Sequence, residues 1–221
     1  MPSFQAIIFD LDGLLVDSER VWHIAETEMI AARGRVYPPE IRAQVIGLRV
    51  DATLKFLREI FQFSETVEEL NRDLLKRYLH RIPAEVKAKP GAQEIVEFVH
   101  IQCIPTAIAS SSPTVVIDAE VDAQGWGDYF ALRCTAEDDL HGKPAPDIYL
   151  RTAKLLGVHP ADCIALEDSP NGARAAVAAG MTCYAVPDPA HSCPEHFATI
   201  TPHVFPDLYA VLKQIRNWDG H

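Results

Sequence analysis

The stretch Ala6-Ile7-Ile8-Phe9-Asp10-Leu11-Asp12-Gly13 decides the fold. Residues 6–9 are continuously apolar, which is typical of a short strand that is covered by helices on both faces of a parallel sheet. The strand ends in two acids, Asp10 and Asp12. A carboxylate at the end of a buried strand is costly unless a positive group compensates it, so this segment predicts both a buried strand and a charged site at its tip.

The pattern of a short apolar run followed by polar residues returns along the chain. Residues 105–109, 163–166 and 182–186 are further strand candidates, and residues 130–135 are a weaker one. Helix-like stretches separate or follow them, at residues 92–100, 115–123, 147–156, 172–179 and 208–216. Alternating strands and helices imply right-handed crossovers. The sequence therefore predicts an α/β fold with a Rossmann-like, doubly wound parallel sheet.

One segment breaks the alternation of strands and helices. Residues 18–82 contain no strand candidate but fit helices at 19–33, at 52–61 with Asp51 as cap, and at 66–82, where Thr66 and Glu69 are spaced as a capping box. Residues 83–90 carry two prolines and are interpreted as a linker. We therefore expect a core of residues 1–16 and 87–221 and a small α-helical cap of residues 17–86.

Composition limits the classes of function. The chain has 221 residues, 48% of them apolar, and no apolar run approaches the ~20 residues that a membrane span needs. Its formal net charge of -11 disfavours nucleic acid and anionic membranes as partners. The five cysteines are odd in number and include no Cys-x-x-Cys motif, which favours buried thiols in a reducing compartment. We expect a cytoplasmic protein that is a monomer or a weak dimer.

The polar residues of interest all follow predicted strands, where open α/β sheets bind ligands. Besides Asp10 and Asp12, these residues are Ser110 and Ser111, Lys143 in a Gly-Lys-Pro turn, and Glu167 with Asp168. Each alone has an ordinary reading, since acids and serines cap helices and a Gly-Lys-Pro turn is usually solvated. Together, the acids predict a site for Mg²⁺, a hard cation that prefers oxygen ligands, while the lysine and serines suit a phosphate group.

These motifs occur in the order and spacing of the haloacid-dehalogenase-like superfamily, which the sequence resembles over its whole length. The motifs are Asp10-Leu11-Asp12-Gly13, the strand-terminal Ser110, Lys143 in Gly-Lys-Pro-Ala-Pro-Asp, and Glu167-Asp168-Ser169-Pro170-Asn171-Gly172. Within the superfamily the chain is most similar to the β-phosphoglucomutase-like subgroup, and there to bacterial phosphatases of 2-deoxyglucose 6-phosphate and hexitol phosphates. The helical insertion resembles the cap of that family.

The resemblance implies a magnesium-dependent phosphatase acting on a small phosphorylated metabolite. Asp10 is expected to attack phosphorus and form an aspartyl-phosphate, with Asp12 as general acid and base. Ser110, Ser111 and Lys143 are expected to bind phosphate. The metal ligands implied are Asp10, the backbone carbonyl of Asp12, Asp168, and Glu167 directly or through water.

Alternatives to a phosphatase stay open at this stage. A phosphomutase needs a second cationic phosphate site in the cap, and mutases of this subgroup carry a histidine where this chain has Trp22. Dehalogenases lack an acid at the position of Asp12. A non-catalytic module that binds phosphorylated ligands is a further alternative.

Substrate specificity is expected from the cap, through Glu19, Trp22 and Arg49. Glu19 could accept hydroxyl protons, Trp22 could pack on a sugar, and Arg49 could donate to its oxygens. Alternatively, Trp22 belongs to the hydrophobic core of its helix, and Glu19 and Arg49 are solvated or paired with other charges.

Overall fold

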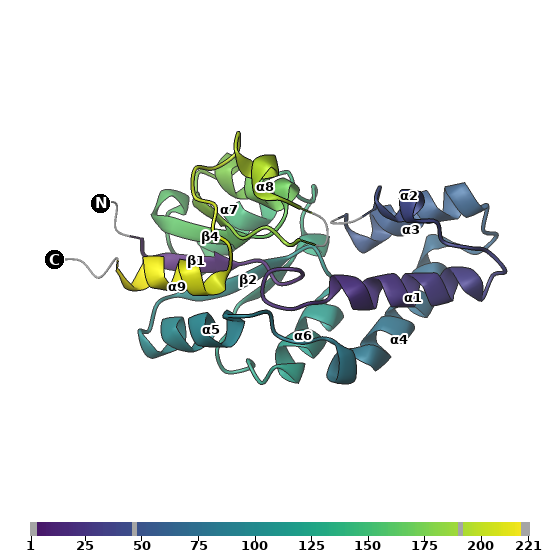
Figure 1. The fold of residues 1–221 in the computed structure, drawn as a ribbon, viewed down its shortest axis with the longest axis horizontal. Coiled ribbons are helices and arrows are strands. Elements are labelled where there is room, and N and C mark those ends of the chain that lie inside the picture. The colour runs from purple at the N-terminus through teal and green to yellow at the C-terminus, as the bar shows by residue number, and fades with distance from the viewer. Residues whose placement is uncertain (1–3, 46–47, 190–191, 218–221) are drawn as a thin grey trace.

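The computed structural model describes residues 4–45, 48–189 and 192–217 (Figure 1). Five parallel strands form one sheet in the order β3-β2-β1-β4-β5. The strands are β1 (Ala6–Phe9), β2 (Thr106–Ser110), β3 (Arg133–Thr135), β4 (Cys163–Glu167) and β5 (Thr182–Ala185). The five predicted strands and the α/β fold are confirmed, with small differences in where each strand begins and ends.

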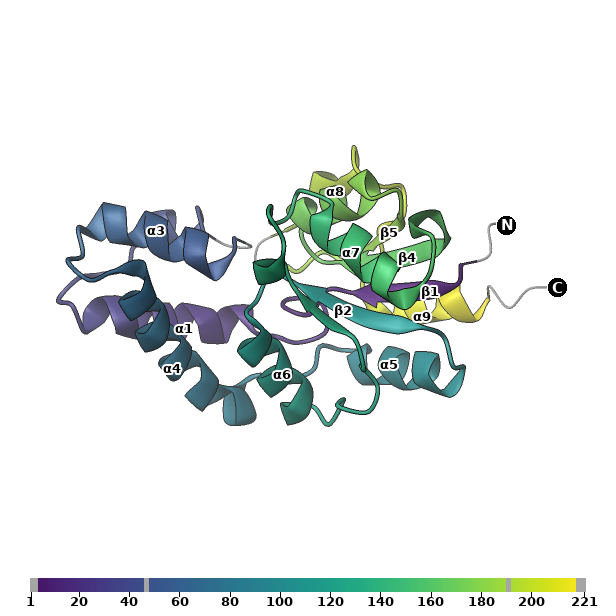
Figure 2. The ribbon, with the colours of Figure 1, turned by 180° about the vertical axis from the view of Figure 1, so that it is seen from behind.

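Helices cover both faces of this sheet. The helices of the core are α5 (Ala92–Ile101), α6 (Thr114–Ala123), α7 (Asp147–Leu156), α8 (Pro170–Ala178) and α9 (Leu208–Arg216). Figures 1 and 2 show α7 and α8 on one face of the sheet and α5, α6 and α9 on the other.

The alternation of side chains in β1 explains this layering. Ile7 and Phe9 belong to the hydrophobic cluster that contains buried residues of α5, α6 and α9, whereas Ala6 and Ile8 belong to the cluster formed with α7 and α8. Because successive side chains of a strand point to opposite faces, a fully apolar strand needs helices on both sides. The central position of β1, paired with β2 and β4, places its carboxyl end in the middle of the sheet edge.

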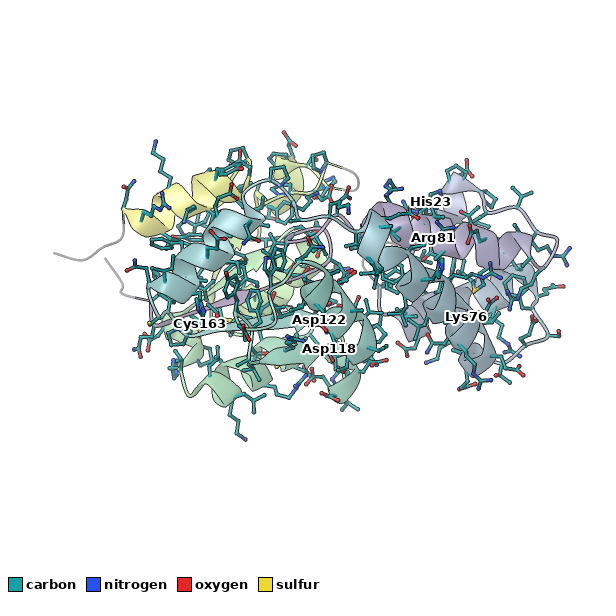
Figure 3. The ribbon with its side chains drawn as sticks, turned by 90° about the horizontal axis from the view of Figure 1, so that it is seen from below. His23, Lys76, Arg81, Asp118, Asp122 and Cys163 are labelled. Atoms are coloured by element: carbon teal, nitrogen blue, oxygen red, sulfur yellow. The ribbon has the colours of Figure 1, made fainter. Side chains whose placement is uncertain are left out.

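The residues between β1 and α5 form a helical region, which we call the cap. Its helices are α1 (Glu19–Ala31), α2 (Pro39–Arg42), α3 (Val50–Phe61) and α4 (Val67–Glu85). They lie beyond the carboxyl ends of the strands (Figures 1 and 2). Figure 3 shows His23, Lys76 and Arg81 on the cap helices, and Asp118 and Asp122 on α6 of the core.

Helices α1 and α4 pack against each other and form the base of the cap. Both contribute buried side chains to a hydrophobic cluster that continues into the core. The predicted capping box at Thr66 and Glu69 is confirmed, since each side chain bonds the other's backbone N–H.

The structure corrects three details of the sequence analysis. Pro83 lies inside α4, which continues to Glu85, so the linker predicted from residue 83 is shorter. Helix α3 begins at Val50, which places Asp51 in its first turn rather than at the cap. Helix α2 was not predicted, because four residues are too few to show helical periodicity.

All five cysteines are free, and Cys134, Cys163 and Cys183 are buried as predicted, whereas Cys103 is exposed and Cys193 is half-buried. Within the described residues, no helix is both long and apolar enough to cross a bilayer.

Candidate active site

A buried lysine links the ends of β1 and β4. Lys143 Nζ donates to Asp10 Oδ1 and to Glu167 Oε1, both at 2.6 Å, and to the carbonyl oxygen of Ala109 at 3.0 Å. Asp10 follows β1 and Glu167 ends β4, whereas Lys143 comes from the loop that precedes α7. The side chains of all three are at most 9% exposed. The sheet therefore brings three residues that are distant in sequence to one point.

Three carboxylates meet beside this lysine. Oxygens of Asp10, Glu167 and Asp168 all lie within 4.8 Å of one another, and all three residues are buried. Burial, together with the negative charges of Glu167 and Asp168, raises the pKa of Asp10, although Lys143 opposes this effect. These three buried acids offer oxygen ligands only, and they outnumber the neighbouring Lys143, so the set fits a hard divalent ion such as Mg²⁺.

The charge of Lys143 is secured by its neighbours. Burial alone would lower the pKa of Lys143, but the carboxylates of Asp10 and Glu167 outweigh burial and raise it. Tyr149 from α7 donates a short hydrogen bond to Glu167 Oε1, the same oxygen that accepts from Lys143. The ammonium group is thus held, charged, at the tip of β1.

Two glycines leave room for the carboxylates of this cluster beside the backbone. Gly13 has a φ of +80°, and a Cβ there would lie 2.2 Å from an Asp168 carboxylate oxygen. A Cβ at Gly172 would lie 1.9 Å from a carboxylate oxygen of Glu167. Both distances are shorter than any van der Waals contact, so neither position accepts a side chain without displacing an acid of the cluster.

The carboxylate of Asp12 is held by four donors. Its Oδ1 accepts from Ser18 Oγ at 2.7 Å and from Trp22 Nε1 at 3.2 Å. Its Oδ2 accepts from Ser110 Oγ at 3.0 Å and from Ser112 Oγ at 2.7 Å. Ser18 and Trp22 belong to the start of the cap, whereas Ser110 is the last residue of β2 and Ser112 lies in the loop that follows it. Asp12 therefore joins cap and core.

A pocket opens from Asp10 into the cap. Its lining includes every predicted core-site residue except Glu167, which lies beneath it. Of the three predicted cap residues, Glu19 and Trp22 line the pocket. Arg49 is not among its described lining residues and instead donates to Asp51 Oδ1 at 3.2 Å and to the carbonyl of Asp139 at 3.4 Å.

Sequence reasoning missed several residues of this region. Ser18, Ser112 and Tyr149 bond directly to Asp12 or Glu167, and Glu26 and Arg42 line the cap side of the pocket. Ser18 offered only the signal of an N-cap ahead of a helix, whereas in the structure its side chain makes no capping bond and donates to Asp12 instead. Glu26 offered none, because a single glutamate on a helix is usually solvated.

Comparison with known proteins gives consistent matches across most of the chain. The family model for haloacid dehalogenase-like hydrolases matches residues 4–180. Hexitol phosphatase B of Escherichia coli K12 is 34% identical over 187 residues, which cover 83% of this chain and 84% of that protein. A Drosophila melanogaster protein named a probable pseudouridine-5'-phosphatase is 35% identical over 190 residues, with 82% and 81% covered.

A solved structure extends the match to three dimensions. The crystal structure of a HAD family hydrolase from Deinococcus radiodurans R1, with bound phosphate and sodium, superposes with a TM-score of 0.75 at 27% identity. The alignment covers 99% of this chain and 97% of that one.

Proposed function

Because this chain belongs to the haloacid dehalogenase-like hydrolase family, we propose that it is a magnesium-dependent phosphatase of a small sugar or polyol phosphate. The observation that carries the proposal is the meeting of Asp10, Lys143 and the acids Glu167 and Asp168 at one end of a pocket. Relatives named as phosphatases of hexitols and of phosphorylated carbohydrates support the substrate class. The proposal keeps residues 17–86 as a cap that closes over a core of residues 1–16 and 87–221.

Asp10 is the nucleophile in this proposal. Its carboxylate oxygen forms a bond to phosphorus while the bond from phosphorus to the ester oxygen breaks, which leaves an aspartyl-phosphate and an alcohol. Lys143 neutralises charge on the transferring group, and the backbone N–H of Ser111 donates a hydrogen bond to it. The Ser110 hydroxyl, which donates to Asp12 in this structure, turns its hydrogen to the phosphate when the substrate binds. Positioning and charge neutralisation of this kind provide most of the catalysis of phosphoryl transfer.

Asp12 moves the proton in both half-reactions. It gives a proton to the departing ester oxygen, and then takes one from the water that attacks the aspartyl-phosphate, so that inorganic phosphate leaves and Asp10 is restored. The donors that surround Asp12 fix its position between the cap helix α1 and the serine loop after β2. Closing the cap would therefore align the acid with the substrate.

The metal site completes the phosphate cradle. Asp10, Asp168 and the backbone carbonyl of Asp12 would hold Mg²⁺, with Glu167 bound directly or through water. When bound, the ion supplies positive charge to the phosphate oxygens. The acids present have the oxygen chemistry and the spacing for it.

In the cap, we assign Glu19 and Trp22 to the substrate side of the pocket. Arg49 donates to a carbonyl of the loop that precedes Lys143, so in this structure it acts as a contact between cap and core.

Phosphate release from a panel of sugar and polyol phosphates tests this function. We expect magnesium-dependent turnover, and a loss of at least about a thousandfold in kcat for Asp10→Asn. Asp128→Asn is the matched control, because Asp128 is exposed and remote from the pocket. If Asp10→Asn kept more than about a tenth of the wild-type rate, the nucleophile would have to be another residue.

A further inference from the structure

The cap wall of the pocket carries a polar cluster that the reaction at Asp10 does not use. Glu19 and Glu26 come from α1 and Arg42 from α2, and all three line the pocket. Arg42 donates from one nitrogen to Glu19 Oε2 at 3.2 Å and to the Glu19 carbonyl at 3.1 Å. The cluster is therefore a built structure with a paired guanidinium, not a set of solvated surface charges.

The cluster retains hydrogen-bonding capacity that the protein does not fill. Glu26 is only 8% exposed. Arg42 Nε is buried and has no hydrogen-bond partner within the described residues. Buried polar atoms in native proteins nearly always have a partner. An unfilled donor on a residue of the pocket wall indicates a polar ligand.

The charge of the pocket restricts what this ligand can be. Among the described lining residues, Lys143 and Arg42 are the cations. Lys143 is bonded to Asp10 and Glu167, and Arg42 is bonded to Glu19 with Glu26 nearby. At pH 8, above the value of about 7 to which burial raises the pKa of Glu26, the cap wall has two carboxylates for one guanidinium. A second phosphate or a carboxylate on the substrate would meet repulsion there, whereas hydroxyl groups could donate to the glutamates and accept from the arginine.

We propose that Glu19, Glu26 and Arg42 form a subsite for a neutral, hydroxyl-rich leaving group and reject esters with a second anionic group. This inference rests on the proposed phosphatase function and deepens it. The apolar lining beside the cluster, including Trp22, Val45 and Leu74, gives the carbon skeleton of such a group a surface to pack against. A phosphomutase, which must hold a bisphosphate, is disfavoured by the same charges.

Matched substrates test the subsite. We would measure kcat/KM for sorbitol 6-phosphate, for 6-phosphogluconate, which adds a carboxylate, and for fructose 1,6-bisphosphate. The wild-type protein should prefer sorbitol 6-phosphate by at least about a hundredfold over both. Comparable kcat/KM values for the neutral and the doubly anionic esters would overturn the inference.

Removing the two carboxylates should weaken this selection at pH 8, where both are ionised in the wild-type protein. In Glu19→Gln/Glu26→Gln, Arg42 is left as an uncompensated cation, so kcat/KM for 6-phosphogluconate relative to sorbitol 6-phosphate should rise at least about tenfold. Glu40→Gln/Glu59→Gln makes the same change of charge at exposed cap positions outside the pocket lining and should leave the ratio unchanged. An unchanged ratio in the first variant, or an equal rise in the second, would refute the subsite.

Hydrolysis of p-nitrophenyl phosphate separates this inference from the function it rests on. Its leaving group has no hydroxyl-rich chain, so the wild-type protein and the control Glu40→Gln/Glu59→Gln should hydrolyse it at rates within about threefold of each other. Absence of turnover of every ester by the wild-type protein would refute the phosphatase itself. Normal turnover of p-nitrophenyl phosphate without discrimination among the sugar esters would refute the subsite alone.

Discussion

Replacing Glu26 by glutamine tests the buried polar interior of the cap through protein stability. Burial raises the pKa of Glu26 from 4.5 to about 7, with the Tyr37 hydroxyl opposing this effect. Well below pH 4.5 the carboxyl is protonated in both the folded and the unfolded chain, so its ionisation does not change the free energy of unfolding. As the pH rises toward 7, the unfolded chain releases its proton first, and the folded state becomes less stable relative to it.

The magnitude follows from the two pKa values. Their difference of about 2.5 corresponds to about 3.5 kcal/mol at about 1.4 kcal/mol per pKa unit. Glutamine has nearly the same shape and does not titrate. The free energy of unfolding of Glu26→Gln should therefore match that of the wild-type protein near pH 4.5 and exceed it by about 3.5 kcal/mol at pH 8, or about 7–14 °C in Tm.

Thermal unfolding of both proteins from pH 4.5 to 8 measures this difference, with the exposed cap variant Glu40→Gln as control. The reasoning fails if the stability difference between Glu26→Gln and wild type is the same at both ends of the pH range.

Three further perturbations address the core of the site. Asp12→Asn should lower kcat by about 10²–10⁴-fold yet leave magnesium affinity nearly intact in a titration, because the proposed contact at that position is the backbone; a wild-type rate would assign the proton transfer to another acid. EDTA should abolish turnover and Mg²⁺ should restore it, and phosphate release unaffected by the chelator would remove the metal from the proposal. Gly172→Ala should lower the free energy of unfolding in urea by about 1–3 kcal/mol, because the added Cβ clashes with Glu167. Gly127→Ala, whose Cβ would make only ordinary van der Waals contacts, should change this free energy little. Equal losses in the two variants would contradict this explanation.

The arrangement of the core could be predicted because its signals are local and repeated. Apolar runs that end in polar residues marked the strands, and parallel strands necessarily bring their carboxyl ends to one edge. Asp10, Lys143, Glu167 and Asp168 could therefore be grouped before any coordinates were known. Tyr149 could not, because a tyrosine inside an amphipathic helix has the same sequence pattern whether its hydroxyl is satisfied by water or by a buried acid.

The cap was harder to predict because its polar residues depend on packing between helices. Glu26 and Arg42 look like solvated positions in the sequence. In the structure Glu26 is buried, and Arg42 is half-buried where α2 meets α1 through its bonds to Glu19. Arg49 shows the opposite case. Its neighbourhood resembles the family's cap, but its side chain reaches the loop before Lys143 and a carboxylate on its own helix.

Chemical trapping of the phosphorylated protein tests the central claim most directly. An acyl phosphate on aspartate is reduced by borohydride to homoserine, so protein quenched during turnover, reduced and digested should carry homoserine at position 10 in mass spectrometry. Trapping at another residue, or continued turnover with aspartate at position 10 always unmodified, would contradict the account.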